Sequence, residues 1–299
     1  MPPVPVRPTR ARAATAALWL ALALGAGCKR EDAATADDER SDDGGARVSV
    51  AARVVTTRGT AEIRRGPDAP WNRIRAGDRV EVQDSVRTSP SGGLELAVGE
   101  VKIRLRERSE FRLQKVTAKR LRARVLGGIE SESPEDSERA LEVEAEGSDA
   151  VAVSHGGHFS MMSDGRGVVA VASVAGTVTL SAHGSEVQLQ PGQVSRVRGE
   201  SAPDAPSRAL RKVLMSVKWP TRRASHKRVL PLEGRVEVGS RVAVRGQDVP
   251  VDAEGRFHTQ VPLAQGSQQV TIRVVDVLGR EARESLQVSV DTKRPGVAP

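Results

Sequence analysis

Residue types that carry chemistry are sparse in this chain, and their spacing favours turns over catalytic or metal sites. Five histidines and one cysteine occur among 299 residues. His155 and His158 form a His-x-x-His pair, but on a strand a three-residue offset points two side chains to opposite faces, and no adjacent carboxylate completes a metal site. Asp252, Glu254 and Gly255 lack the alternating acids of a calcium loop, so we expect a hairpin turn there.

Signatures of enzyme chemistry are also missing. The sequence contains no Gly-x-Ser-x-Gly elbow and no glycine-rich phosphate loop. We therefore predict a protein that is not an enzyme, with no catalytic residues, no metal and no cofactor. The net charge of +8 makes acidic partners worth considering. Nucleic acid is not expected as a partner, because aromatic residues for base stacking make up 2% of the chain and its start resembles a secretion signal.

The start of the chain has the residue order of a secretory signal. Three arginines within residues 7–12 precede an uncharged run over residues 13–24, and small residues follow up to Cys28. The apolar run is shorter than the roughly 20 residues that a membrane-spanning helix needs. Its Gly-Ala-Gly-Cys end resembles a lipoprotein lipobox, although Gly25 stands where that motif prefers Leu. The alternative is an ordinary signal with a chance cysteine.

The lipobox resemblance implies that Cys28 is acylated and becomes the new N-terminus. Acyl chains on this cysteine would anchor the protein to a membrane leaflet. We expect a signal peptide over residues 1–27 and a flexible acidic tether over residues 28–47, where no apolar residue is larger than Ala. Lys29, rather than Asp, follows the cysteine. By the sorting rule of enteric lipoproteins, this implies the outer membrane and a position facing the periplasm.

Residues 48–199 alternate apolar and polar side chains with a period of two, as in Leu94, Leu96 and Val98. The runs are short and bounded by Gly, Pro, Ser or Asp, which is typical of half-buried antiparallel strands. The sequence therefore predicts an all-β fold. Residue types that suit tight reversals mark the expected structural turns, which are Gly77, Asp78, Gly176, Pro191, Gly192, Asp252 and Gly255.

Two stretches of this region resemble the FecR domain. Residues 69–111 run Trp, spacer, Gly-Asp, strand, Thr-rich turn and Leu-x-Leu, and residues 152–197 carry a Val-rich strand, a Gly-x-Val turn and a Pro-Gly-Gln turn. Gly157 to Phe159 depart from the family's Gly-Thr-x-Phe. The resemblance implies a β-sandwich or a short β-solenoid over residues 48–199. It also implies a periplasmic role in protein binding or sensing. The family's relay to a sigma factor is not carried over, because the sequence shows neither its helical domain nor its transmembrane helix.

Cations recur at every second position on several expected strands of this region, so each run places them on one face. We interpret them as a docking face for a polyanionic envelope component or an acidic protein. The alternative is a solvated strand face. An acidic insert at about residues 130–149 either folds against this face or is disordered, and neutralisation would weaken the docking interpretation. The cations are Lys102, Arg104, Arg106, Arg112, Arg120, Arg122 and Arg124.

A basic linker over residues 200–229 and a second all-β region over residues 230–292 follow. The linker can form one short helix through Leu210, Val213, Leu214 and Val217, which Pro220 would end. The second region has short valine-rich strands, and its Asp-x-x-Gly-x-Phe and Asp-x-x-Gly-Arg motifs resemble bacterial immunoglobulin-like domains of the glucodextranase-B type. That resemblance implies a small β-sandwich that spaces or presents its neighbour. Residues 293–299 form a tail.

Taken together, the sequence predicts a non-enzymatic, lipid-anchored protein of the cell envelope. In this interpretation the FecR-like region binds an unknown envelope protein, and the immunoglobulin-like region spaces or presents it. The alternative is a cell-wall or polysaccharide binder, for peptidoglycan or lipopolysaccharide, with the arginine face as one candidate surface.

Overall fold

The computed structural model describes residues 51–221 and 224–292, and these residues fall in one compact unit of the chain. Their regular structure consists of β-strands without a helix, so the all-β prediction is confirmed. No helix of this part of the chain is long and apolar enough to cross a membrane. The expected signal peptide, Cys28, the tether and the tail over residues 293–299 lie outside the described residues.

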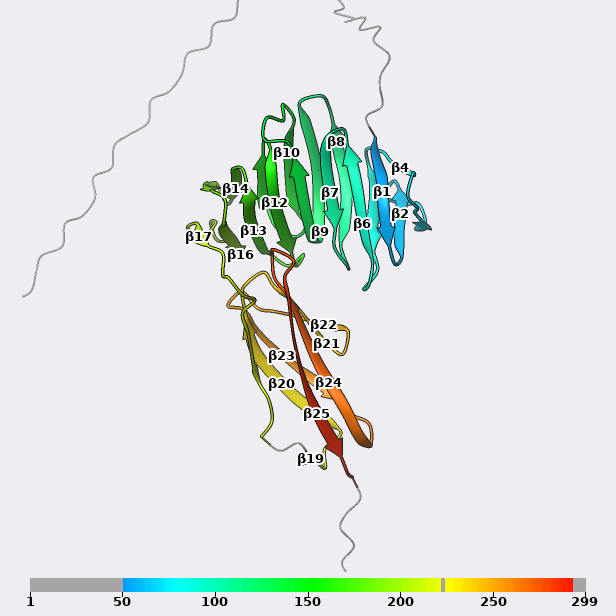
Figure 1. The fold of residues 1–299 in the computed structure, drawn as a ribbon, viewed down its shortest axis with the longest axis vertical. Helices are drawn as coiled ribbons and strands as arrows, with labels where there is room; N and C mark the ends of the chain where they lie inside the picture. The colour runs from blue at the N-terminus through cyan, green and yellow to red at the C-terminus, as the bar shows by residue number, and fades with distance from the viewer. Residues whose placement is uncertain (1–50, 222–223, 293–299) are drawn as a thin grey trace, which may run out of the picture. The chain divides into compact units, whose positions relative to one another are not determined.

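The first 17 strands form a two-layer sandwich, here called the first sandwich (Figure 1). One layer contains β1, β4, β6, β7, β12, β13, β16 and β17, and the other contains β2, β3, β5, β8, β10, β11, β14 and β15. The strand bounds are β1 Ala52–Arg58, β2 Ala61–Arg65, β3 Asn72–Arg73, β4 Arg79–Val80, β5 Asp84–Thr88, β6 Gly93–Val98, β7 Val101–Leu105, β8 Glu110–Val116, β9 Arg120–Ser133, β10 Ala140–Ala145, β11 Val151–Ser154, β12 Gly157–Ser163, β13 Val168–Ala175, β14 Val178–Ala182, β15 Ser185–Leu189, β16 Gln193–Arg198 and β17 Ser207–Arg208.

Strand β9 belongs to both layers of the first sandwich. Its first half pairs with β8 and β10, and its second half pairs with β7 and β12. The passage occurs at Gly127, whose φ is +86°. A Cβ there would lie 2.6 Å from the Oγ of Ser109, so only glycine fits this crossing without a shift of its neighbours.

The core of the first sandwich is built by the period-two pattern. Leu94, Leu96 and Val98 on β6 face inward and are buried, whereas Glu95 and Ala97 between them are only partly covered. The same alternation on the facing layer buries Phe111 and Leu113. These inward side chains join into one continuous apolar cluster that spans residues 52–197. Alternation therefore decides which side chains the two layers share.

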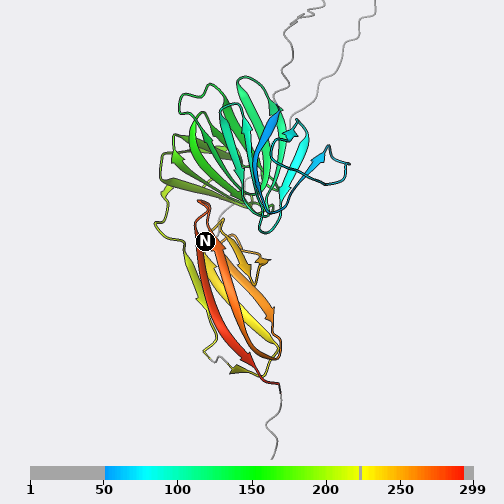
Figure 2. The same ribbon diagram turned by 45° about the vertical axis from the view of Figure 1, so that its right-hand side comes forward.

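A second sandwich with its own core follows (Figure 2). One sheet contains β18, β20 and β23, and the other contains β19, β25, β24, β21 and β22 in that order. The long pair β24 and β25 runs side by side in orange and red. The bounds are β18 Met215–Lys218, β19 Ala224–Ser225, β20 Val229–Val236, β21 Arg241–Val244, β22 Gln247–Val249, β23 Arg256–Pro262, β24 Gly266–Val275 and β25 Glu281–Val290.

The expected linker contributes strands to both sandwiches. β17 pairs with β16 of the first sandwich, and β18 and β19 pair with β20 and β25 of the second. The short helix expected through Leu210, Val213, Leu214 and Val217 is wrong, because Met215–Lys218 form an extended strand. Partly buried Val213, Met215 and Val217 pack on the second core with alternate spacing, which a strand provides and a helix does not.

Candidate functional site

The seven predicted cations do not share one surface. Lys102 and Arg104 lie on β7 in one layer of the first sandwich. Arg112 lies on β8, and Arg120, Arg122 and Arg124 lie on the first half of β9, which belongs to the other layer. Arg106, just after β7, reaches a different environment that is described below. The single docking face expected from alternation is therefore corrected to separate patches on two layers.

Acidic side chains neutralise most of these cations. Strand β10, from the expected acidic insert, pairs in parallel with β9, so Glu142 lies beside Arg122 and Glu144 beside Arg124. The insert is therefore ordered strand over residues 130–133 and 140–145, and the disordered alternative is wrong. The ion pairs join Arg120 to Glu142, Arg122 to Glu142 and Glu144, Arg124 to Glu144 and Glu146, and Arg104 to Glu95, Glu130 and Glu132.

Glu144 is the centre of the β9–β10 ion pairs. Its carboxylate accepts hydrogen bonds from Gln114 at 2.9 Å and from Arg124 at 2.9 Å. Burial alone would raise the pKa of Glu144, but these bonds and the charges of Arg122 and Arg124 outweigh it and lower the pKa below its usual value. The carboxylate thus stays ionised and holds the arginines in place, which leaves them less available to a polyanion.

Arg106 instead joins the two sandwiches. Its guanidinium donates to the carbonyl oxygen of Val277 at 2.8 Å and to the Oγ of Ser160 at 3.2 Å. Burial lowers the pKa of Arg106, with the charges of Glu130 and Asp276 acting in the opposite direction. A partly buried guanidinium of this kind is stabilised by the carbonyl that accepts from it.

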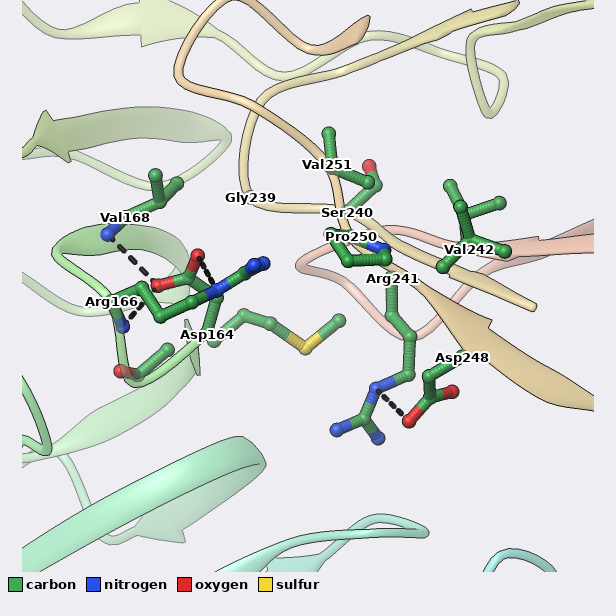
Figure 3. Close-up of a pocket in the computed structure, with 13 residues that line it drawn as sticks. Asp164, Arg166, Val168, Gly239, Ser240, Arg241, Val242, Asp248, Pro250 and Val251 are labelled. Atoms are coloured by element: carbon green, nitrogen blue, oxygen red, sulfur yellow. Dashed lines mark hydrogen bonds and ion pairs between the residues drawn. The ribbon is translucent and has the colours of Figure 1, made fainter. Parts of the chain in front are cut away.

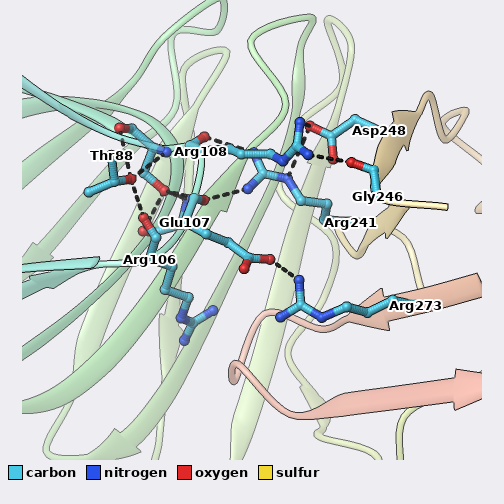
Figure 4. Close-up of polar contacts among 10 residues, drawn as sticks. Thr88, Arg106, Glu107, Arg108, Arg241, Gly246, Asp248 and Arg273 are labelled. Atoms are coloured by element: carbon cyan, nitrogen blue, oxygen red, sulfur yellow. Dashed lines mark hydrogen bonds and ion pairs between the residues drawn. The ribbon is translucent and has the colours of Figure 1, made fainter. Parts of the chain in front are cut away.

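Neighbouring residues extend the polar contact between the sandwiches. Arg241 donates to the carbonyl oxygens of Glu107 at 2.6 Å and of Arg108 at 2.9 Å, and Arg273 pairs with the Glu107 carboxylate. Arg108 in turn lies 3.4 Å from the carboxylate of Asp248. Figure 4 shows these side chains converging from both sandwiches. We call this set of contacts, together with Arg106 and the apolar cluster below, the junction.

An apolar cluster completes the junction. Val277, from the turn between β24 and β25, packs with residues on the outer face of the first sandwich and is 5% exposed. Gly239 approaches so closely that a Cβ there would lie 2.4 Å from the Cβ of Ala170. The first-sandwich members of the cluster are Met162, Ala170, Ala172 and Val194. An apolar centre with a hydrogen-bonded rim is the usual anatomy of a specific interface.

A pocket of about 270 Å³ opens beside this cluster (Figure 3). Asp164 and Arg166, from the turn between β12 and β13, form one side, and the segments around Ser240 and Pro250 of the second sandwich form the other. The Asp164 carboxylate accepts from the backbone N–H groups of Arg166 at 2.8 Å and Val168 at 3.0 Å, which fixes the turn. We call this space the junction pocket.

The predicted turn residues occupy reversals of the chain. Gly77, Gly176, Gly192 and Gly255 all have positive φ, a conformation that glycine adopts without steric cost. The carboxylate of Asp78 accepts the N–H of Arg75 at 2.8 Å, and Pro191 directly precedes Gly192.

The motif at Asp252 forms a turn, and one of the two histidines of the His-x-x-His motif pairs with a glutamate. Asp252 accepts from the backbone of Glu254 at 3.0 Å and of Arg256 at 2.7 Å, as a hairpin turn requires. His158 pairs with Glu130 at 2.7 Å, while His155 lies in the bend before β12. Among the described residues, no group of three or more His, Cys, Asp or Glu is placed to hold a metal ion.

The second-sandwich side of the junction was missed by reasoning from sequence. Arg241, Asp248 and Arg273 lie on strands of ordinary composition, so nothing local distinguishes them from solvent-facing charges. These residues can be recognised only from the contact between the two sandwiches in the folded structure.

Comparisons with known proteins give weak similarity. No family model matches the chain, and no curated protein matches it. Two crystal structures of an anti-sigma factor candidate from Parabacteroides distasonis align over 42% of this chain and 59% of their own, at 14% and 13% identity and a TM-score of 0.37. A polysaccharide lyase aligns over 80% of this chain and 40% of its own, at 12% identity and a TM-score of 0.21. The alignment thus spans less than two thirds of these proteins, and it is too weak to assign a family or a function.

Proposed function

We propose that this chain is a non-enzymatic binding protein of the cell envelope, held to a membrane by a lipid on Cys28. In this proposal the FecR-like first sandwich binds another envelope protein, and the immunoglobulin-like second sandwich presents it at a fixed orientation. The resemblances in the sequence supply the two module types. Support from the structure comes from the way in which the two sandwiches are joined.

The junction is the observation that carries the proposal. Arg106 and Arg241 each donate to backbone carbonyls of the opposite sandwich. Val277 of the second sandwich is buried against the first. Contacts to backbone atoms fix orientation more strictly than contacts between mobile side chains, because the acceptor cannot rotate away. Because the two sandwiches are held in a fixed orientation, the second can present the first to a partner. A flexible tether between them would not fix this orientation.

The ion pairs on β9 and β10 favour a protein partner over a polyanion. Arg122 and Arg124 already lie within 3.2 Å of glutamate oxygens, so a polyanion would have to displace these carboxylates before it could bind. A protein partner can instead contact the paired surface with matched donors and acceptors. One candidate surface for the polysaccharide alternative, the arginine face, is thus already paired with carboxylates.

Lipid anchoring is tested by intact mass and fractionation of the protein expressed with its own signal. The wild type should gain the mass of an acylated cysteine and enter the membrane fraction, whereas Cys28→Ser should do neither. If both the wild type and Cys28→Ser are soluble and unmodified, the proposed lipid anchor is wrong and the protein is a freely diffusing binder.

Partner binding is tested by photo-crosslinking in the full chain. A photoreactive residue at exposed Val174 of the first sandwich and another at exposed Val229 of the second provide matched positions. We expect a discrete protein adduct from positions on the first sandwich and none from Val229. Retention of the whole chain on lipopolysaccharide or peptidoglycan, lost in the double variant Arg122→Gln and Arg124→Gln, would contradict the proposal and favour the polysaccharide alternative.

A further inference from the structure

We propose that the junction pocket binds a small organic anion with an apolar body, such as a medium-chain or aromatic carboxylate. This site is independent of the anchor and of the protein partner proposed above. The pocket draws its walls from both sandwiches, and such interfaces are frequent places for ligand sites. Its volume of about 270 Å³ is roughly nine times the ~30 Å³ that one water molecule occupies in the liquid, which limits the ligand to a small molecule.

Apolar side chains line much of the junction pocket. Met162 and Val168 contribute from the first sandwich, and Val249, Pro250 and Val251 contribute from the second. Met162 and Val249 are themselves buried, so the wall is part of the packed structure rather than a mobile surface. A ligand that fills this space must therefore present a hydrocarbon or aromatic surface to it.

The polar groups of the pocket that remain available are donors. The Oγ of Ser240 is buried and has no hydrogen-bond partner among the described residues, and Ser240 as a whole is 8% exposed. A buried hydroxyl without a partner is costly, so a ligand oxygen that accepts its proton would relieve that cost.

Arg166 supplies the second donor. Its guanidinium forms an ion pair with the Asp164 carboxylate through Nε at 3.4 Å and makes no ion pair with any other described residue. Figure 3 shows the Arg166 side chain extended toward the residues of the second sandwich. The Nη edge of a guanidinium matches the two oxygens of a carboxylate.

The other charged groups at the pocket are already occupied. The Asp164 carboxylate accepts from two backbone N–H groups, and Asp248 pairs with Arg108. Arg241 uses its guanidinium on the carbonyls of Glu107 and Arg108. The Ser240 hydroxyl without a partner and the singly paired Arg166 guanidinium therefore remain as donors at the pocket, and they favour an anionic ligand over a cation or a neutral hydrocarbon.

A ligand in this pocket would contact both sandwiches at once. Ser240 and Val249 belong to the second sandwich, and Arg166 and Met162 belong to the first. Binding should therefore stabilise the junction as well as the pocket, because the ligand is bound only when both sides are in place. The site would let a small metabolite acid bias how firmly the second sandwich is held.

The test uses octanoate as the probe and 1-octanol as its neutral match, with calorimetric titration and thermal unfolding of the full chain. Octanoate should bind at one site and raise the Tm, and 1-octanol should have little effect at the same concentration. Equal effects of octanoate and 1-octanol, or no effect of octanoate, would overturn the proposal.

Variants distinguish binding in the junction pocket from a general attraction of anions to this basic protein. Arg166→Gln should weaken octanoate binding by about tenfold, as expected for loss of a charge-assisted contact. Arg198→Gln, which removes an arginine paired with Asp204 and outside the pocket, should leave it unchanged. Ser240→Ala should also weaken binding while raising the Tm of the free protein. Equal losses in Arg166→Gln and Arg198→Gln would show nonspecific attraction by a basic protein only.

Discussion

Arg106 shows what alternation along a strand can and cannot reveal about a single residue. The period of two correctly places Lys102, Arg104 and Arg106 on the side of β7 that faces away from the core. Whether that side meets water depends on what covers it, and Val277 of the second sandwich covers Arg106. Sequence could therefore predict the direction of this side chain but not its environment, because the cover is 171 residues away in the chain.

The first prediction concerns this residue. Arg106→Met keeps much of the side-chain volume but leaves the Val277 carbonyl and the Ser160 hydroxyl without their donor. We expect the free energy of unfolding to fall by about 1–3 kcal/mol, measured by urea denaturation. Lys102→Met on the same strand is exposed and serves as the control, with a change within about 0.5 kcal/mol. Equal losses in both variants would contradict the buried role of Arg106.

A second prediction at this scale concerns Gly157, where the sequence departs from the FecR motif. Gly157 has a φ of +89°, and a Cβ there would lie 2.2 Å from the carbonyl oxygen of Ala175. Gly184 has a similar φ of +72° but open space around its Cα. Gly184→Ala should cost about 1–2 kcal/mol of stability from backbone strain alone. Gly157→Ala should cost clearly more in the same denaturation assay, and equal costs would exclude the close contact.

At the scale of elements, strands were predictable and their pairing was not. Composition and turns indicated short strands throughout residues 48–199, and the structure has them. The parallel pairing of β9 with β10 could not be read, since alternation gives the face of each strand but no information on its neighbour. This pairing neutralises part of the predicted docking face, because it brings Glu142 and Glu144 beside Arg122 and Arg124.

The third prediction follows from the lowered pKa of Glu144. A carboxylate whose pKa is lower in the folded than in the unfolded protein contributes stability above its unfolded pKa of about 4.3, and this stability is lost as the pH falls through the folded pKa. The free energy of unfolding of the wild type should therefore drop between about pH 5 and pH 3. Glu144→Gln should be less stable at pH 7 and lose less on acidification.

Urea denaturation at a series of pH values measures this difference. Glu100→Gln is a matched control, because Glu100 is an exposed carboxylate in the turn between β6 and β7. Its pH profile should follow that of the wild type. A Glu144→Gln profile with an unchanged acid slope would show that the β9–β10 ion pairs contribute nothing to folding.

For the molecule as a whole, the sequence separated two all-β regions, and the two cores lie within their ranges at residues 52–197 and 230–290. The sequence predicted a basic linker over residues 200–229 between them and no contact, whereas the two sandwiches meet in a packed junction. Its residues come from turns and strand ends that carry no local signal, such as Val277 and Gly239. Interfaces between modules depend on surface complementarity, which a single sequence does not display.

The last prediction tests whether the junction couples the two cores. Val277→Asp places a carboxylate in the apolar cluster that contains Met162, Ala170 and Ala172, where burial of the charge is costly. The wild type should unfold in one calorimetric transition, because loss of either sandwich exposes the buried face of the other. The variant should show two separated transitions, one for each core.

Val174→Asp, at a valine that is 43% exposed on β13, should keep the single transition. If Val277→Asp also keeps one transition at a Tm close to that of the wild type, the two sandwiches do not stabilise each other and the second would act as a tethered spacer.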